Sequence, residues 1–173
     1  SCFPVFKSAG LTPPPQSSNP TSASPTAVFL PLVTRPNNVF FVAPTGSDSS
    51  GTGTESSPWA TIGHAVTAVS DEATILVKPG TYTGQISLRS QFSHGITIRS
   101  MVPYQARLRY NGSVVTCFYC RGITLEGFDI AHTGPGADRY IIQIQNVRHD
   151  SQGGSFVTLR DNVLHDSYNN DII

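Results

Sequence analysis

The chain has 173 residues, and its eleven basic and eleven acidic side chains give a formal net charge of zero at pH 7. A chain with balanced charges lacks the excess of positive charge with which proteins bind nucleic acids or acidic membranes. No stretch approaches the roughly 18 apolar residues that a transmembrane helix requires. With 13 Pro, 15 Gly and only 13% charged residues, the composition is typical of an all-β protein of extracellular type. We therefore expect no nucleic-acid partner and no transmembrane segment.

The first 38 residues differ in composition from the rest of the chain. Residues 11–38 are rich in Pro, Ser and Thr, and they include the run Pro13-Pro14-Pro15. Such a sequence buries too little apolar surface to offset the entropy lost on ordering. Residues 1–38 are therefore predicted to form a flexible N-terminal segment. Within it, residues 28–33 are apolar enough to dock against the domain or against a partner.

A folded domain is predicted over residues 39–173, and its first elements are a strand and a helix. Residues 39–44 are typical of a strand, and a Gly- and Ser-rich loop follows them. Ser57 is predicted to cap a helix with Pro58 at its first position, because these residue types favour those places. The apolar face of this helix comprises Ile62, Ala65, Val66 and Val69. We expect the helix, together with Trp59, to cover the exposed core at the start of a repetitive fold.

The strongest pattern is a tetrad of aliphatic, Thr, aliphatic and charged residues that occurs three times. The copies are residues 96–99, 123–126 and 157–160, and they begin 27 and 34 residues apart. Such alternation is typical of a strand with one buried and one exposed face. Spacings in this range are typical of stacked structural repeats. We therefore expect three parallel strands, one above another, in an all-β solenoid.

Stacking of the tetrads predicts which side chains lie together. Two internal rows are expected: Ile96, Ile123 and Val157, and Ile98, Leu125 and Leu159. On the outer face, the charges of Arg99, Glu126 and Arg160 would alternate in sign, which is the favourable arrangement between neighbouring strands. The charges and the apolar rows therefore support the same register.

Other short aliphatic segments are predicted to form the remaining sides of the same coils. These segments are residues 73–77, 86–88, 114–117 and 140–144. Pairing Val115 with Ile142 keeps the 27-residue offset of the first two tetrads. Ile172 and Ile173 continue the pattern, so the chain ends inside a strand. We expect the domain to be incomplete at its C-terminus, with its open last coil covered by further chain or by a protein partner.

Three runs carry a family resemblance. Residues 41–48 read Phe-Val-Ala-Pro-Thr-Gly-Ser-Asp, residues 57–62 read Ser-Pro-Trp-Ala-Thr-Ile, and residues 75–82 read Ile-Leu-Val-Lys-Pro-Gly-Thr-Tyr. They resemble the N-terminal part of secreted right-handed parallel β-helix proteins of the pectate-lyase-like superfamily. The resemblance implies that fold, a secreted or cell-surface location, and contact with a polysaccharide or cell-surface glycan. It implies no single activity, because the superfamily includes lyases, hydrolases, epimerases and noncatalytic proteins.

For a lyase, the resemblance implies β-elimination on a uronate, in which a cation, often calcium, neutralises the carboxylate. Calcium binds oxygen ligands, and residues 165–171 are the densest supply of them. The predicted calcium ligands are Asp138, Asp166, Asn169 and Asp171. An offset of 31 residues places Asp138 one coil below Asn169. The alternative interpretation is that these side chains only satisfy backbone groups in turns.

The sequence singles out no base for such a reaction. The candidates are Arg160, Arg148, Arg139 and Lys78, of which Lys78 precedes Pro-Gly and is typical of a turn. Two hypotheses therefore stay open. The first is a calcium-assisted polysaccharide lyase or its N-terminal part, and the second is a noncatalytic structural or adhesive surface protein that assembles with a partner.

The three cysteines allow at most one internal disulfide. Cys117 falls on the inward side of its predicted strand, and Cys120 lies at the following corner. Burial in the core is the preferred interpretation, because a zinc site needs about four ligands. A bond between Cys117 and Cys120 would need a sharp turn that brings their Cα atoms within roughly 7 Å. A bond between Cys2 and Cys120 is the alternative in an oxidising compartment.

Overall fold

The computed structural model of the chain describes residues 38–137, 139–145 and 156–168. The chain divides into two units, Ser1–Val33 and Thr34–Ile173, and every described residue belongs to the second unit. The predicted flexible segment over residues 1–38 thus lies outside the described residues, except for Asn38.

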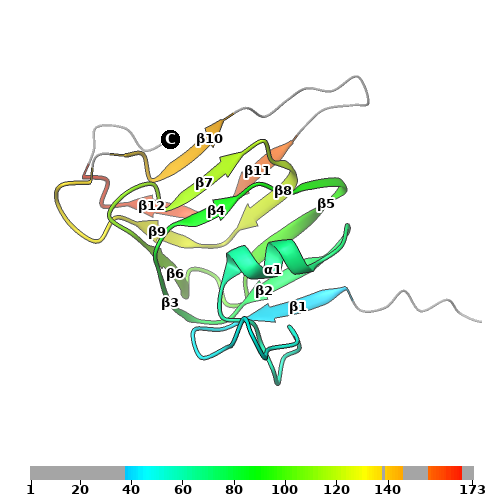
Figure 1. Ribbon diagram of the computed structural model, residues 1–173. Helices are drawn as coiled ribbons and strands as arrows, with labels where there is room; N and C mark the ends of the chain where they lie inside the picture. The colour runs from blue at the N-terminus through cyan, green and yellow to red at the C-terminus, as the bar shows by residue number, and fades with distance from the viewer. Residues whose placement is uncertain (1–37, 138, 146–155, 169–173) are drawn as a thin grey trace, which may run out of the picture. The chain divides into compact units, whose positions relative to one another are not determined.

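Strands of three parallel sheets alternate along the described chain (Figure 1). Sheet A contains, in spatial order, β1 (Val39–Val42), β2 (Thr74–Val77), β5 (Gln91–Ser100), β8 (Arg121–Glu126) and β11 (Val157–Arg160). Sheet B contains β3 (Gly80–Thr83), β6 (Ala106–Arg109), β9 (Asp129–Ala131) and β12 (Val163–His165). Sheet C contains β4 (Ile86–Leu88), β7 (Val115–Phe118) and β10 (Ile142–Gln145). From β2 onward, three coils pass through sheets A, B and C in that order, and β11 and β12 continue the order in a fourth. This is the architecture of a parallel β-helix.

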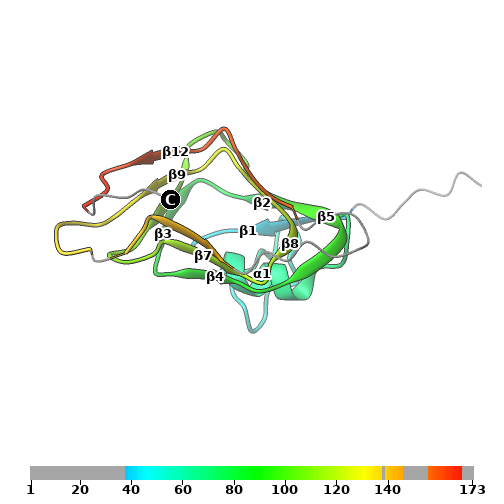
Figure 2. The same cartoon turned by 90° about the horizontal axis from the view of Figure 1, so that it is seen from above.

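The tetrads stack in sheet A in the predicted register. Ile98 pairs with Leu125, and Leu125 pairs with Leu159. Ile98 and Leu125 are buried, whereas Leu159, on the last described strand of sheet A, is partly exposed and packs against the same core. Figure 2, turned by 90°, shows β12 over β9 and β7 over β4, as expected for superimposed coils. The predicted solenoid of parallel strands is therefore confirmed.

The outer face of sheet A also follows the prediction. Arg99 lies opposite Glu126, and Glu126 lies opposite Arg160. The guanidinium of Arg160 donates a hydrogen bond of 2.6 Å from Nη2 to Oε2 of Glu126. The alternating charges thus occur in register, and one of the two pairs forms a direct ion pair.

The helix α1 (Ile62–Ala68) begins four residues later than the sequence predicted. Thr61, and not Ser57, is its N-cap, because the Thr61 side chain accepts a hydrogen bond from the His64 amide. Trp59 cannot join the helix, since its backbone bonds to Phe41 and Ala43 beside β1. Ile62, Ala65 and Val66 are buried, and α1 contacts β1, β2 and β4. The predicted covering role of the helix is therefore confirmed.

Trp59 packs in the core as predicted. The residue is 7% exposed, and its ring stacks on Phe40 with 5.4 Å between ring centroids. Its indole Nε1 donates to the Gly51 carbonyl at 3.1 Å. Among the described residues, no helix is long and apolar enough to cross a membrane.

Cys117 and Cys120 form a disulfide at the corner between β7 and β8. Both residues are buried, as the sequence predicted. The pairing that the sequence left open is thus between Cys117 and Cys120, and the alternative of a bond from Cys2 to Cys120 was wrong. The physical reason is the corner itself: Tyr119 adopts a φ of 58°, and the reversal brings the two Cα atoms to 5.6 Å, within the range that a disulfide spans.

The turns from sheet B to sheet C lengthen from coil to coil. They comprise residues 84–85 in the first coil, 110–114 in the second and 132–141 in the third. The turns from sheet A to sheet B follow no such trend: they comprise residues 78–79, 101–105, 127–128 and 161–162 in the four coils. In the last of these, Asn162 accepts from the Phe128 amide and donates to the Leu125 carbonyl, both at 2.9 Å. This side chain joins two coils and fixes the start of β12.

Candidate functional site

A group of titratable side chains joined by hydrogen bonds lies on the outer face of sheet B. Successive residues of a strand point to opposite faces. The inward row of sheet B comprises Tyr82, Leu108, Ile130 and Leu164, of which the middle two are buried and the outer two partly buried. The residues on either side of this row therefore point outward. Arg109, Asp129 and His165 come from β6, β9 and β12, three successive coils.

Asp129 is the centre of this group, and the Arg109 guanidinium and the His165 imidazole converge on it. Arg109 Nη2 donates to Asp129 Oδ1 at 2.6 Å, and Arg109 Nη1 donates to the Asp129 carbonyl at 2.8 Å. His165 Nε2 lies 2.8 Å from the same Oδ1. Neither partner faces Asp129 in register, because Arg109 and His165 both pair with Ala131. Both long side chains therefore cross diagonally, over the small and buried Ala131.

The ionisation of Asp129 follows from these contacts. Partial burial is the largest single influence on this carboxyl, and it opposes the charged form. The hydrogen bonds and charges of His165 and Arg109 together outweigh burial, so the pKa of Asp129 lies below its ordinary value of 3.8. Asp129 is thus anionic at neutral pH and holds its partners in place.

His165 bridges two carboxylates. Its Nδ1 lies 3.0 Å from Asp166 Oδ2, and its Nε2 contacts Asp129. Both nitrogens donate at once only when the ring carries two protons. Asp166 is the most exposed member of the group, with 62% of its side chain accessible, whereas Asp129 is 20% accessible. His165 therefore has one partly buried partner and one exposed partner.

His132 lies one position beyond β9, next to this group. Its side chain is buried, with 4% exposure. Its Nδ1 accepts a hydrogen bond of 3.2 Å from the Tyr168 amide, so the proton of the neutral ring is assigned to Nε2. Within the described ranges, that buried Nε2 has no hydrogen-bond partner.

Of the predicted calcium ligands, the structure places only Asp166 in this cluster. Asp138, Asn169 and Asp171 lie outside the described residues. Among the residues that are described, no group of three or more His, Cys, Asp or Glu side chains could hold a metal ion. The calcium site therefore stays a prediction, with Asp166 as its described member.

The candidate bases either interact with other groups of the protein or lie outside the residues that the structure describes. Arg160 pairs with Glu126 on sheet A, and Arg148 lies outside the described residues. Lys78 Nζ donates to the Glu55 carbonyl at 2.9 Å and lies over the Phe41 ring, as fits a turn residue. Sequence reasoning missed Arg109, Asp129 and His165. The offset of 34 residues between the last two tetrads, carried five residues beyond the end of each, would have aligned His165 with Ala131.

Comparisons with known proteins support the fold. Residues 44–100 match a family described as "Protein of unknown function (DUF1565)". The crystal structure of a GH136 lacto-N-biosidase from Eubacterium ramulus matches with a TM-score of 0.61 and 15% sequence identity. That match covers 76% of this chain and 27% of the other, so the chain spans about a quarter of its neighbour's length. A search of curated proteins found no match. The chain thus has the fold of the parallel β-helix proteins, and its superfamily stays an expectation.

Proposed function

We propose that this chain is part of a carbohydrate-active, extracellular β-helix protein that contacts a glycan at the Asp129 cluster, defined as Arg109, Asp129, His165 and Asp166. The observation that carries the proposal is the placement of His165 between an ion-paired carboxylate and an exposed one. The fold neighbour is named a lacto-N-biosidase, which supports a carbohydrate substrate class. Sugar hydroxyls and uronate carboxylates both find donors and acceptors in such a cluster.

The reaction that these groups suit is proton abstraction next to a uronate carboxylate. Asp129 would orient His165 through Nε2 and stabilise the imidazolium form, and Nδ1 would take the proton once Asp166 moves away. The carbon–carbon double bond then forms as the glycosidic carbon–oxygen bond breaks, and the leaving oxygen recovers the proton from His165. The substrate carboxylate needs a positive partner during this step.

Calcium is the proposed partner for that carboxylate. Asp166 is exposed enough to exchange His165 for a cation, and the sequence offers Asp138, Asn169 and Asp171 as further oxygen ligands. Calorimetric titration of the 173-residue chain with calcium should show binding that Asp166→Ala weakens. Glu126→Ala, on sheet A, is the matched control and should leave the binding unchanged. No heat of binding to the native chain would remove calcium from the proposal.

The reaction is tested with uronate polymers. Polygalacturonate and alginate are incubated with the chain, and formation of unsaturated product is followed by ultraviolet absorbance. We expect product from the native chain and at least a hundredfold loss of rate in His165→Gln. Arg160→Gln changes a cation outside the cluster and should keep the rate. Absence of product with all uronate polymers, together with retained glycan binding in affinity electrophoresis, would leave binding without catalysis.

A second candidate function is noncatalytic and structural. The same cluster joins three successive coils through Arg109, Asp129 and His165. Such contacts would stabilise the stacking of the coils. In that case His165→Gln would lower thermal stability without any effect on glycan binding. Assembly with a protein partner at the last described coil belongs to this candidate, because Val157, Leu159 and Leu164 are only partly buried there. Light scattering with and without candidate partners tests it.

A further inference from the structure

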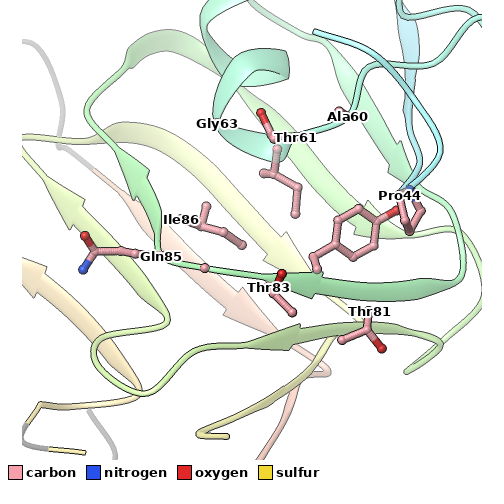
Figure 3. A pocket seen from close by; sticks show the side chains of 11 residues that line it. Pro44, Ala60, Thr61, Gly63, Thr81, Thr83, Gln85 and Ile86 are labelled. Carbon is pink, nitrogen blue, oxygen red and sulfur yellow. The ribbon is translucent and has the colours of Figure 1, made fainter.

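A pocket of about 420 Å³ lies below the first strand of sheet B. Figure 3 shows Thr61 and Gly63, at the start of α1, on one side of it, and Thr81, Thr83 and Ile86 on the other. The pocket is within the size range of small-molecule sites. It belongs to the first coil, whereas the Asp129 cluster joins the second, third and fourth coils.

The pocket exists because sheet B starts one coil later than sheet A. Sheet A has β1 beside β2, but in the described chain sheet B ends with β3. The backbone N–H groups of Gly80 and Gly84 donate hydrogen bonds to the carbonyls of Gln105 and Arg109, on the side of β6. Alternate residues of a parallel strand bond to opposite neighbours, so the backbone groups of Thr81 and Thr83 point to the free edge. Both residues line the pocket.

The lining defines the class of ligand. It includes Thr81 and Thr83, which carry hydroxyls, and none of the lining residues has a charged side chain. The Gln85 amide is turned to the next coil, where its Nε2 donates to the Ser113 carbonyl at 3.2 Å. A charged ligand would lose its hydration there without gaining an ionic partner. Pro44, Ile62 and other apolar groups supply the remaining surface. A compact, neutral molecule with several hydroxyls and apolar C–H faces fits this combination.

The free edge is too short for a peptide strand. Pro44 closes one end, because a Cβ on Gly80 would lie 2.5 Å from the Pro44 Cγ. The other end turns away at Gly84, where φ is +105°. Only Thr81 and Thr83 are left to pair with an incoming chain, whereas strand addition uses a longer run of backbone groups. A small molecule needs no more than these groups.

We propose that this pocket, lined by Thr61, Gly63, Thr81, Thr83 and Gln85, binds a neutral saccharide unit. The inference extends the carbohydrate function proposed above to a second site with a different charge preference. The Asp129 cluster would contact charged groups of a glycan, and the first-coil pocket would take an uncharged sugar ring.

Gly63 offers a direct test, because a Cβ there meets no atom within 4 Å and its backbone is helical. Gly63→Leu should fill the pocket while improving helix propensity. Gly134→Leu is the matched control, since Gly134 also has open space around it and lies in the third B-to-C turn. Cellobiose, lactose and maltose are the probes, measured by saturation-transfer NMR and calorimetry. Circular dichroism establishes that each variant is folded.

We expect at least one neutral disaccharide to bind the native chain and Gly134→Leu, with at least a tenfold loss of affinity in Gly63→Leu. If Gly63→Leu does not fold, Thr83→Val decides, because it keeps strand propensity and removes one hydroxyl; unchanged affinity would then overturn the proposal. Binding that survives in folded Gly63→Leu, or no binding to the native chain, overturns it as well. Neutral disaccharides should still bind Asp129→Asn, which shows that this pocket is separate from the Asp129 cluster. A wrong proposal for the cluster would show itself in the experiments with uronate ligands and not in these.

Discussion

His165 Nε2 and Asp129 Oδ1 lie 2.8 Å apart, although the two residues are 36 positions apart in the chain and not opposite each other in their strands. The contact forms only when β12 stacks on β9 in the observed register, because a shift by one residue would turn one side chain inward. The contact between His165 and Asp129 therefore depends on correct stacking of the third and fourth coils.

Asp129→Asn should destabilise the protein at neutral pH by about 1 kcal/mol, since its hydrogen bonds involve charged partners but remain partly screened by solvent. The pKa of Asp129 is lower in the folded state than its ordinary value of 3.8. Its contribution is thus fully present above that value and is lost as the pH falls through the folded pKa.

Urea unfolding of the native chain and of Asp129→Asn, repeated from pH 7 to about pH 3, measures this contribution. The difference between the two free energies of unfolding should be constant near neutral pH and shrink below about pH 4. Asp48 and Asp71 also have lowered pKa values, but they are present in both proteins and cancel. A difference that grows on acidification would contradict the assignment.

Leu125→Ala should cost about 2–5 kcal/mol of unfolding free energy, because it leaves a cavity in the middle of a buried row. Leu125 is 2% exposed and lies between Ile98 and Leu159. Val163→Ala removes methyl groups at a site that is 44% exposed and serves as the control, with little expected effect. Chemical denaturation checks both. Equal losses in the two variants would contradict the stacked core.

Maleimide labelling should find one reactive thiol in the unfolded, unreduced chain and three after reduction, because Cys117 and Cys120 are bonded and Cys2 is the remaining cysteine. Replacing both bonded cysteines by alanine should cost at least about 2 kcal/mol, as expected for a short closed loop. Cys2→Ala keeps the bond and is the control. Three labels before reduction would show that the bond is absent.

Asp48→Ala should loosen the segment that leads into α1. The Asp48 carboxylate accepts from the Ala60 and Thr61 amides at 2.8 and 3.0 Å and from the Thr61 hydroxyl at 2.7 Å. Loss of these bonds should lower stability by about 1–2 kcal/mol, comparable to loss of a helix cap. Ser49→Ala, at an exposed neighbouring site, should be close to neutral. Thermal unfolding followed by circular dichroism distinguishes the two variants.

The sequence predicted sheet A well and sheet B not at all, for a physical reason. Tetrads such as Ile123-Thr124-Leu125-Glu126 contain two full periods of alternation, which suffices to recognise a strand. The strands β9 and β12 contain only three residues each, too few to show a period. Since Arg109, Asp129 and His165 all lie on sheet B, their cluster could not be predicted from local patterns. It required the register that the tetrads of sheet A impose on the next strand.

The lengthening of the B-to-C turns, from residues 84–85 to 132–141, has a consequence for how such a protein diversifies. Coil stacking depends on the strands and on the tight corners, so extra residues at this one edge change the surface without disturbing the core. Each coil can therefore acquire its own wall around a ligand independently of its neighbours. If the protein binds a long polymer, the length of the loop on each coil would then determine selectivity for the unit bound at that coil, while the strands stay unchanged.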